Sequence, residues 1–155
     1  MTDPCDFNFL DPGHLFDGEL TVQLVNFHPA EPIRGWVPWY EFSLHVPGLD
    51  VPVGQLSFRA GHGTWFEKYG GHIGYGVEPS HRGRHFAERA VRLLLPFIRQ
   101  HGFERVWITC NPDNWPSRRT CERLGAVFVG IVAVPPDHDM YHRGEREKCR
   151  YRLEL

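Results

Sequence analysis

Four consecutive residues, Arg82-Gly83-Arg84-His85, have the side chains whose chemistry is easiest to name. They follow a predicted strand and precede a predicted helix. The first backbone N–H groups of a helix have no partner within it, and the helix dipole adds partial positive charge there. With two guanidinium groups beside them, these N–H groups suit an anion such as a phosphate. A solvated strand–helix connection with a basic rim has the same residues, so the pattern alone leaves both interpretations open.

A strand and a helix must position this turn. Residues 72–77 alternate as a strand, with Gly74 and Gly76 on one face, and bare backbone of this kind often lets a ligand approach closely. The apolar spacing after the turn predicts a helix over residues 84–101 with one wide core-facing stripe. Pro96 lies inside that helix, and we expect a kink there.

A second segment also has polar side chains directly after a strand. Residues 105–110 are expected to form this strand, and the polar run 111–117, NPDNWPS, follows it. A short helix then extends to Leu124. Gly125 is expected to end the helix, and a strand resumes over residues 126–132.

The first of these two segments resembles the acetyl-CoA motif of the GNAT acetyltransferases. That family's pattern is Arg/Gln-x-x-Gly-x-Gly/Ala after a strand. Arg82 matches the first position and Ala87 the last, whereas His85 stands where the family usually has glycine. The resemblance implies that backbone N–H groups of this turn bind a pyrophosphate.

The second segment resembles the last motif of the same family. The matching run begins at Asn114-x-x-Ser117 and ends at Gly125. The resemblance is closest to the branch that acetylates ribosomal-protein N-termini and some small amines. It covers roughly residues 71–130 well and the rest of the chain loosely.

The fold that this resemblance implies is a single GNAT-like α/β (α+β) domain over residues 1–155, with an irregular N-terminal arm at residues 1–18. Its central sheet is mixed and mostly antiparallel, with about six to seven strands, helices on both faces, and strands four and five splayed apart. The family usually places two helices between the first two strands. Only about eight residues separate those strands here, so we expect these helices to be reduced or absent.

The remaining strands are predicted from alternation and turn signals. They cover residues 20–27, 36–46, 51–59 and 147–155. Residues 61–71 and 135–146 are expected to be loops. Apolar side chains in the N-terminal arm indicate that the arm is pinned to an apolar surface.

The activity implied by the resemblance is acetyl-CoA-dependent N-acetyl transfer, by direct attack of a primary amine belonging to a small molecule or a protein N-terminus. A non-catalytic module that binds or senses acyl-CoA is the alternative. The expected partners are acetyl-CoA and an unknown amine. The residues expected to bind the co-substrate are Tyr75, Gly76, Val77, Arg82, Gly83, Arg84, His85, Phe86, Ala87, Asn111, Asn114 and Ser117.

The chain differs from its family at the residue that would protonate the departing CoA thiolate. Many GNAT enzymes have a tyrosine at the position of Cys121 as proton donor. A thiol can also donate a proton, although a helical cysteine is more often a small buried hydrophobe. Ser117 could contact the CoA sulfur, or it could cap the helix that follows.

A general base, if the enzyme has one, is expected to be His72, Glu41 or Glu67. A histidine side chain titrates near neutral pH, and His72 stands at the start of the predicted strand 72–77. Glu41 lies on the second strand. A lone histidine on a strand is more often a hydrogen-bonded structural residue, and water alone can carry the proton away.

Composition excludes several classes of protein. A net charge of −2 over 155 residues gives no basic field for nucleic acid or a membrane surface. No apolar run approaches the roughly 20 residues of a membrane span. The four cysteines are far apart, so neither a zinc site nor a disulfide framework is expected. The N-terminus lacks the features of a signal peptide, and we expect a cytoplasmic protein. Exposed aromatic side chains would suit a homodimer contact.

Overall fold

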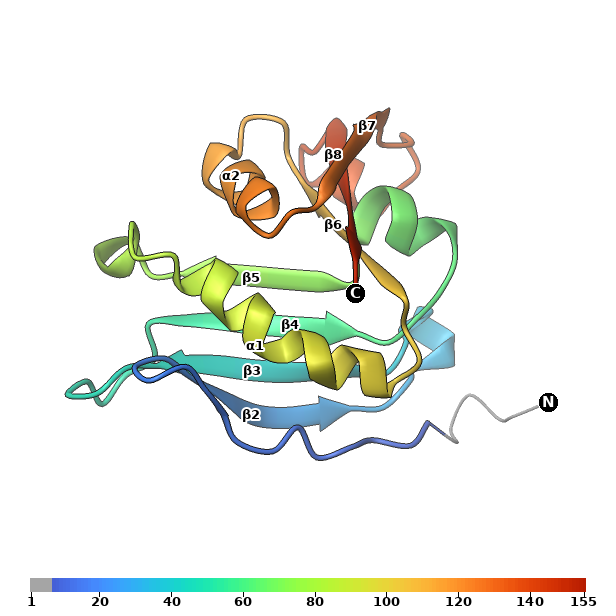
Figure 1. The fold of residues 1–155 in the computed structure, drawn as a ribbon. Helices are drawn as coiled ribbons and strands as arrows, with labels where there is room; N and C mark the ends of the chain where they lie inside the picture. The colour runs from blue at the N-terminus through green and yellow to red at the C-terminus, as the bar shows by residue number, and fades with distance from the viewer. Residues whose placement is uncertain (1–6) are drawn as a thin grey trace. The chain divides into compact units, whose positions relative to one another are not determined.

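The computed structural model describes residues 7–155, and the chain forms two compact units. The first contains the described residues up to 61 together with residues 73–103. The second contains residues 62–72 and 104–155. Figure 1 traces the elements along the chain.

The first unit is built on a five-stranded antiparallel sheet. The strands follow one another in the order β1-β2-β3-β4-β5, so each pairs with its neighbour in the sequence. The sheet consists of β1 (Leu15–Phe16), β2 (Thr21–His28), β3 (Trp39–His45), β4 (Gly54–Arg59) and β5 (Ile73–Val77). β5 is therefore an edge strand of this sheet.

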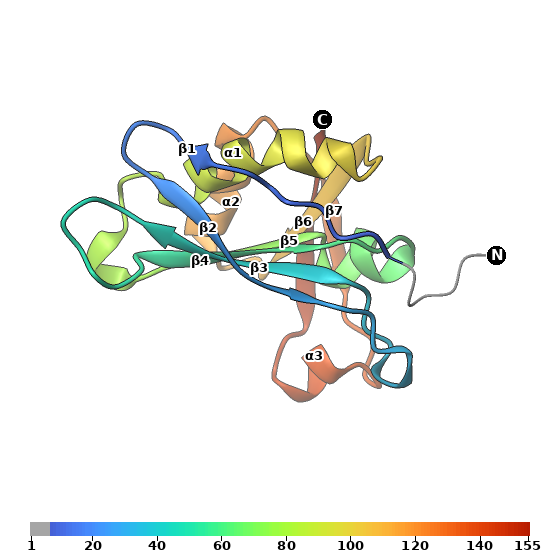
Figure 2. The same cartoon turned by 90° about the horizontal axis from the view of Figure 1, so that it is seen from below.

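One helix, α1 (Phe86–Gln100), packs on this sheet (Figure 2). Alternation along β3 buries Tyr40, Phe42 and Leu44 and leaves Glu41, Ser43 and His45 on the other, half-buried face. The helix contributes an apolar stripe to the same core, as its spacing predicts: Phe86, Ala87, Ala90, Val91, Leu94, Phe97 and Ile98 are all buried. The helix continues through Pro96 as far as Gln100.

The connection between β2 and β3 contains a single 3₁₀ turn, Pro32–Arg34, among the described residues. The expectation that the family's helices are reduced here is therefore confirmed. Proline opens this turn, and Gly35 closes it with φ 72, a left-handed conformation that glycine adopts at little cost.

The N-terminal arm is pinned to the first unit, as expected. The Leu10 N–H donates to the Tyr40 hydroxyl at 2.9 Å, and the ring of Phe9 packs edge-on to Tyr40 with centroids 5.4 Å apart. The expectation of a wholly irregular arm is wrong, because Leu15–Phe16 forms the short strand β1 against β2.

The second unit holds a three-stranded antiparallel sheet in the order β6-β8-β7. Its elements are β6 (Arg105–Cys110), α2 (Trp115–Arg123), β7 (Val127–Ala133), α3 (Asp139–His142) and β8 (Glu147–Glu154). β7 lies at an edge, and its Val127, Phe128, Val129 and Ile131 side chains are exposed. A register shift between Phe128 and Gly130 interrupts its pairing with β8.

The fold class is confirmed, with differences in detail. The described residues form eight strands in two sheets, where one sheet of six to seven strands was expected, and β5 belongs to one sheet and β6 to the other. Two expected loops contain helical turns, a π-helical turn at Phe66–Gly70 and the short α3. No helix among the described residues has the length and apolar character needed to cross a membrane.

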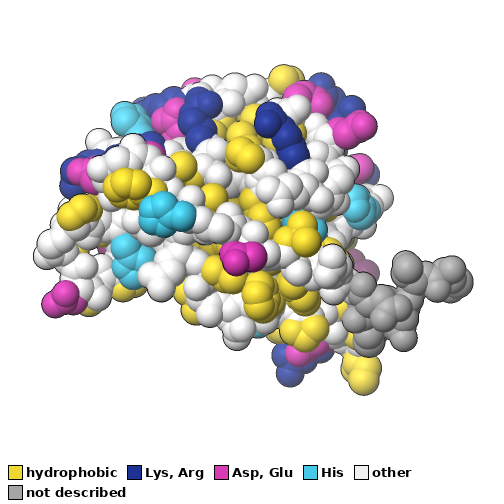
Figure 3. All heavy atoms as spheres, turned by 60° about the horizontal axis from the view of Figure 1, so that its bottom comes forward, with side chains coloured by type: hydrophobic (Ala, Val, Ile, Leu, Met, Phe, Trp, Pro, Cys, Tyr) yellow, Lys and Arg dark blue, Asp and Glu magenta, His cyan; other side chains and the backbone are white. Residues whose placement is uncertain are grey.

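Charged side chains do not gather by sign on the face drawn in Figure 3. Basic and acidic side chains lie close to one another near its edges, and its middle shows mainly apolar and histidine side chains. This distribution agrees with the small net charge of −2.

Candidate functional site

The predicted site residues fall in both units, and the first group begins at the end of β5. The Glu78 N–H donates to the Val53 carbonyl at 2.8 Å, so the backbone N–H of Glu78 faces β4. Successive residues of a strand direct their backbone groups alternately toward and away from the partner strand, so the backbone groups of Gly76 also face β4. The backbone N–H and C=O groups of Tyr75 and Val77 consequently face away from β4, along the outer edge of the sheet.

The turn after β5 is basic and tightly wound. A 3₁₀ turn, Pro79–His81, follows the strand, and Gly83 has φ 88. The Arg82 Nε–H donates to the Val77 carbonyl at 3.2 Å, which ties the side chain to the strand end. The predicted arginine thus lies against the last residue of β5.

His85 has the backbone conformation of a glycine. Its φ is 60 and its ψ is 28, and it is the one non-glycine residue with positive φ among residues 7–155. The family's usual glycine at this position therefore agrees with the observed backbone. The first backbone bond of α1 runs from the Arg89 N–H to the His85 carbonyl at 2.9 Å, so the N–H groups of Phe86, Ala87 and Glu88 precede the helical ladder.

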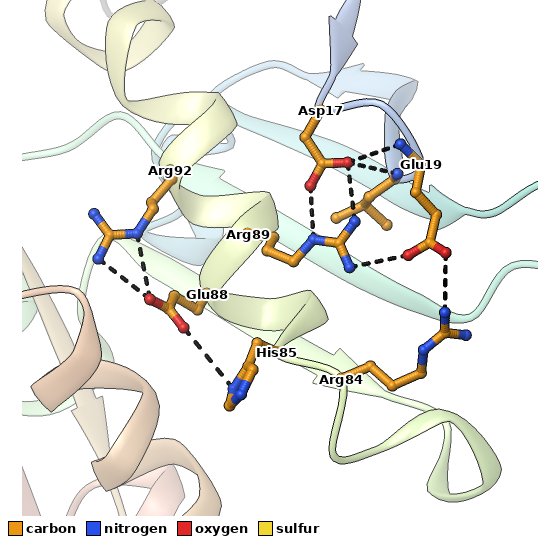
Figure 4. A network of polar contacts seen from close by, with 8 residues as sticks. Asp17, Glu19, Arg84, His85, Glu88, Arg89 and Arg92 are labelled. Carbon is orange, nitrogen blue, oxygen red and sulfur yellow. Dashed lines mark hydrogen bonds and ion pairs between the residues drawn. The ribbon is translucent and has the colours of Figure 1, made fainter.

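The side chains of Arg84 and His85 leave the turn in opposite directions (Figure 4). The Arg84 guanidinium donates to Glu19 Oε2 at 2.9 Å, and His85 Nδ1 lies 3.9 Å from Glu88 Oε2. Glu88 also accepts from Arg92, one helical turn further on.

An ion-pair network joins the start of β2 to α1. Arg89 donates two hydrogen bonds to Asp17, at 2.6 and 2.9 Å, and one to Glu19 at 3.1 Å. The hydrogen bond from Arg89 lowers the pKa of Asp17 far below its usual range, although partial burial opposes the shift. The same bond raises the pKa of Arg89. Sequence reasoning missed both acids, because nothing in the sequence relates them to a helix some 70 residues later.

Glu41 lies on the polar face of the first unit's sheet. Its Oε1 contacts His28 Nε2 at 2.9 Å, and its side chain is 41% exposed. The imidazole of His28 stacks on Trp39, with ring centroids 3.9 Å apart. Glu41 is thus an accessible carboxylate with a histidine partner.

His72 lies in the second unit, where it is buried and hydrogen-bonded to the backbone of β6. Its backbone N–H donates to the Trp107 carbonyl at 2.7 Å, and its Nδ1 accepts the Trp107 N–H at 2.9 Å. The ring stacks on Phe66 at 5.2 Å. Since Nδ1 accepts, the neutral ring carries its proton on Nε2. His72 precedes the strand β5, in which it was expected to lie.

The residues of the last motif surround the start of α2. The Asn114 side chain caps the helix by accepting the Ser117 N–H at 3.3 Å. The cap expected at Ser117 is therefore supplied by Asn114. The buried Ser117 hydroxyl hydrogen-bonds to Cys110, whose pKa is raised chiefly by burial. Cys121 is fully buried.

Asn111 contacts a buried lysine that the sequence did not single out. Lys148 Nζ donates to Asn111 Oδ1 at 2.8 Å and to Glu145 Oε1 at 2.7 Å, with only 8% of its side chain exposed. Burial alone would raise the pKa of Glu145, but the bond and charge of Lys148, with the charge of Arg143, lower it overall. Within residues 7–155, no group of three metal-ligating side chains is present.

The chain matches a known protein family. A model described as an acetyltransferase (GNAT) domain matches residues 20–127, well over half of the chain. The chain belongs to the GNAT acetyltransferase family. The match includes the edge of β5, the basic turn and α2.

Among curated proteins, the chain is similar to YnaD of Bacillus subtilis (strain 168), an uncharacterized N-acetyltransferase. The two are 28% identical over 75 residues. This stretch is 46% of the GNAT chain and 44% of YnaD, so the match spans less than half of the relative.

Solved structures share the fold. The ribosomal-protein-S5-alanine acetyltransferase from Vibrio fischeri superimposes with a TM-score of 0.61 and 19% identity, over 75% of this chain and 61% of that chain. The microcin C7 self-immunity acetyltransferase MccE, solved with acetyl-CoA and AMP, gives 0.59 and 18%, over 76% and 61%. At these identities the likeness shows the fold alone.

Proposed function

We propose that this chain is an acetyl-CoA-dependent N-acetyltransferase that acts on a primary amine, belonging to a small molecule or a protein N-terminus. The observation that carries the proposal is the GNAT family match over residues 20–127, which includes the edge of β5 and the basic turn. The acetyl-CoA bound to MccE and the ribosomal-protein acetyltransferase among the structural neighbours support the same conclusion.

The described residues suit the co-substrate. The early N–H groups of α1 and the Arg82 guanidinium are donors for the pyrophosphate. The backbone of Tyr75 and Val77 faces the outer edge of β5, where the pantetheine arm would bind in the manner of an added strand. His85 does not oppose this assignment, since its backbone already has the conformation of the glycine that it replaces.

The proposed reaction is direct acyl transfer. The neutral amine attacks the thioester carbonyl carbon, a C–N bond forms, and the C–S bond breaks. The oxygen that gains negative charge is stabilised by a backbone donor, for which the Val77 N–H is our candidate. The amine loses one proton and the departing thiolate gains one.

The predicted residues differ in how well they suit the two proton transfers. We propose a structural role for His72, because its Nδ1 accepts a backbone N–H and the neutral ring then keeps its proton on Nε2. Glu41 is the better candidate for a base, since its carboxylate is accessible. Cys121 and Ser117 are buried, and water is our preferred proton donor to the thiolate.

One observation favours the alternative, a module that binds acyl-CoA without turnover. The position of the family's tyrosine is taken by Cys121, which is fully buried. The two functions differ in whether thioester is consumed when an amine is offered.

Calorimetric titration with CoA and acetyl-CoA, followed by chromatography of CoA released in the presence of a panel of amines and N-terminal peptides, tests the proposal. Binding with amine-dependent CoA release supports the enzyme. Binding without release for any amine supports the binding module, and absence of binding contradicts both.

A charge-reversal variant tests the phosphate assignment. Arg82→Glu together with Arg84→Glu should abolish CoA binding. Arg99 is an exposed arginine in the last turn of α1, so Arg99→Glu is the matched control and should bind CoA normally.

We also propose a cytoplasmic location, which the free thiols of Cys110, Cys121 and Cys149 support.

A further inference from the structure

Glu19 is an anchored carboxylate beside the basic turn. Its Oε1 accepts from Arg89 at 3.1 Å, and Arg89 itself donates two hydrogen bonds to Asp17. The Asp17 and Arg89 side chains are 22% and 28% exposed, so this part of the network is partly shielded from water. Glu19 therefore cannot leave the turn without giving up its bond to Arg89.

Arg84 is the most exposed member of the same network, and its guanidinium also lies 5.0 Å from the centroid of the Phe86 ring. Its contact with Glu19 Oε2, at 2.9 Å, joins side chains that are 52% and 41% exposed. An exposed ion pair of this kind changes the equilibrium constant between its paired and unpaired states by a factor of about five at most. Figure 4 shows the Glu19 carboxylate between two guanidinium groups, with Arg84 reaching it from the turn. Rotation of the Arg84 side chain alone would break this contact.

The backbone of Arg84 belongs to the turn that is proposed to receive phosphates. A phosphate group carries more negative charge than a carboxylate and accepts several hydrogen bonds from one guanidinium. While Arg84 is paired with Glu19, however, its charge is largely neutralised, and an approaching phosphate also meets the negative charge of Glu19.

We propose that Glu19 competes with the phosphates of CoA for Arg84, so that binding of the co-substrate breaks the Arg84–Glu19 ion pair while Arg89 stays bound to Asp17. This inference rests on the proposed function. It makes Glu19 a residue that sets the affinity for CoA from a position outside the turn, on the segment between β1 and β2.

Replacing Glu19 by glutamine tests the competition. Glu19→Gln removes the charge with little change of shape, and CoA should bind about three- to tenfold more tightly at low salt. The gain should nearly vanish near 1 M salt, where the Debye length is about 3 Å. Glu31→Gln is the matched control, because Glu31 also pairs with an exposed arginine, Arg34, but at the other end of β2. The Glu31→Gln variant should bind CoA with the affinity of the wild type.

A double-mutant cycle with Arg84→Ala shows whether Glu19 acts through Arg84. The gain from Glu19→Gln should be much smaller when Arg84 is absent. Titration with dephospho-CoA identifies the phosphate concerned: a gain with both ligands indicates the pyrophosphate, and a gain with CoA alone indicates the 3′-phosphate. Either result supports the proposal.

Two outcomes overturn it. One is a folded Glu19→Gln variant that binds CoA no more tightly than the wild type at low salt, with Glu19→Ala agreeing. The other is an equal gain with and without Arg84. If the wild type and every variant fail to bind CoA, the proposed function itself is wrong, and that result is distinct from normal wild-type binding without a gain.

Discussion

At the scale of single residues, His85 has an energetic cost that its neighbours must offset. A non-glycine residue in the left-handed region costs roughly 1–2 kcal/mol. The His85 ring lies no closer than 3.9 Å to its charged neighbour, the Glu88 carboxylate. The conformation is therefore imposed by the path from β5 into α1 rather than by the side chain.

The first prediction concerns this backbone. His85→Gly should keep or raise the free energy of unfolding, by up to about 1 kcal/mol, because relief of the left-handed strain exceeds the entropy that glycine adds to the unfolded chain. His85→Ala keeps the strain and should be less stable than His85→Gly by about 1 kcal/mol. Urea unfolding of both variants measures the difference. Equal stability of the two would contradict the backbone argument.

The second prediction concerns Asp17 and acid. Its pKa is lowered in the folded state by Arg89, so its contribution to stability is fully present above the unfolded pKa of about 3.9 and is lost as the pH falls below that value. Asp17→Asn should cost about 1–3 kcal/mol at pH 7. It should also flatten the loss of stability below pH 4. Urea unfolding between pH 7 and pH 2.5 follows both effects, and a wild-type slope in the variant would rule out Asp17 as the source.

Local sequence could predict the residues of the turn and could not predict their partners. Arg82, Gly83 and His85 are neighbours in a recognisable motif, and the motif's glycine position correctly marks the left-handed residue. Glu19 lies 65 positions from Arg84, and only the pairing of β1 with β2 brings it there. An ion pair formed through tertiary structure leaves no periodic signal in the sequence.

At the scale of elements, α2 depends on its first residues. Asn114 accepts the Ser117 N–H, and Pro116 lies in the first turn, where its missing N–H costs no helical bond. The third prediction is that Asn114→Ala lowers the free energy of unfolding by about 1 kcal/mol. Asn114→Asp keeps a capping oxygen and should remain close to the wild type. Calorimetric titration of both variants with CoA then separates capping from co-substrate contact, because loss of binding in the stable Asp variant would indicate direct contact.

Periodicity predicted the long elements and failed on the short ones. The strand 105–110 and the buried stripe of α1 follow from alternation and helical spacing. The turn Phe66–Gly70 has no such pattern, because its conformation depends on side-chain packing with Trp65 rather than on periodic spacing. A Cβ atom on Gly70 would lie only 2.0 Å from the ring of Trp65, so the indole occupies the space that this glycine leaves. A glycine that reads as a loop signal is here a packing requirement.

At the scale of the whole molecule, the chain passes between its two units three times, at residues 61–62, 72–73 and 103–104. Neither unit is a continuous stretch of sequence. We therefore expect the two to unfold together, as chains of this size usually do.

The fourth prediction uses buried thiols to test this. Cys110, Cys121 and Cys149 all lie in the second unit and are buried, and burial raises the pKa of Cys110, so little reactive thiolate is present. In a Cys5→Ser variant, labelling by a thiol reagent in increasing urea should have the same midpoint as the loss of far-UV circular dichroism. Labelling at lower urea would mean that the second unit opens by itself.

The edge strand β7 has a consequence for how this protein could fail. Its apolar side chains are exposed, and one side of its backbone has no strand beside it in the sheet. Such an edge is a template on which a misfolded copy could grow a cross-β fibril. The register shift between Phe128 and Gly130 is a β-bulge, and Gly130 has φ 150. A bulge bends a strand and interrupts the even spacing of backbone hydrogen bonds that a fibril requires. We therefore expect Gly130 to disfavour the growth of fibrils on β7 when the protein is heated or concentrated.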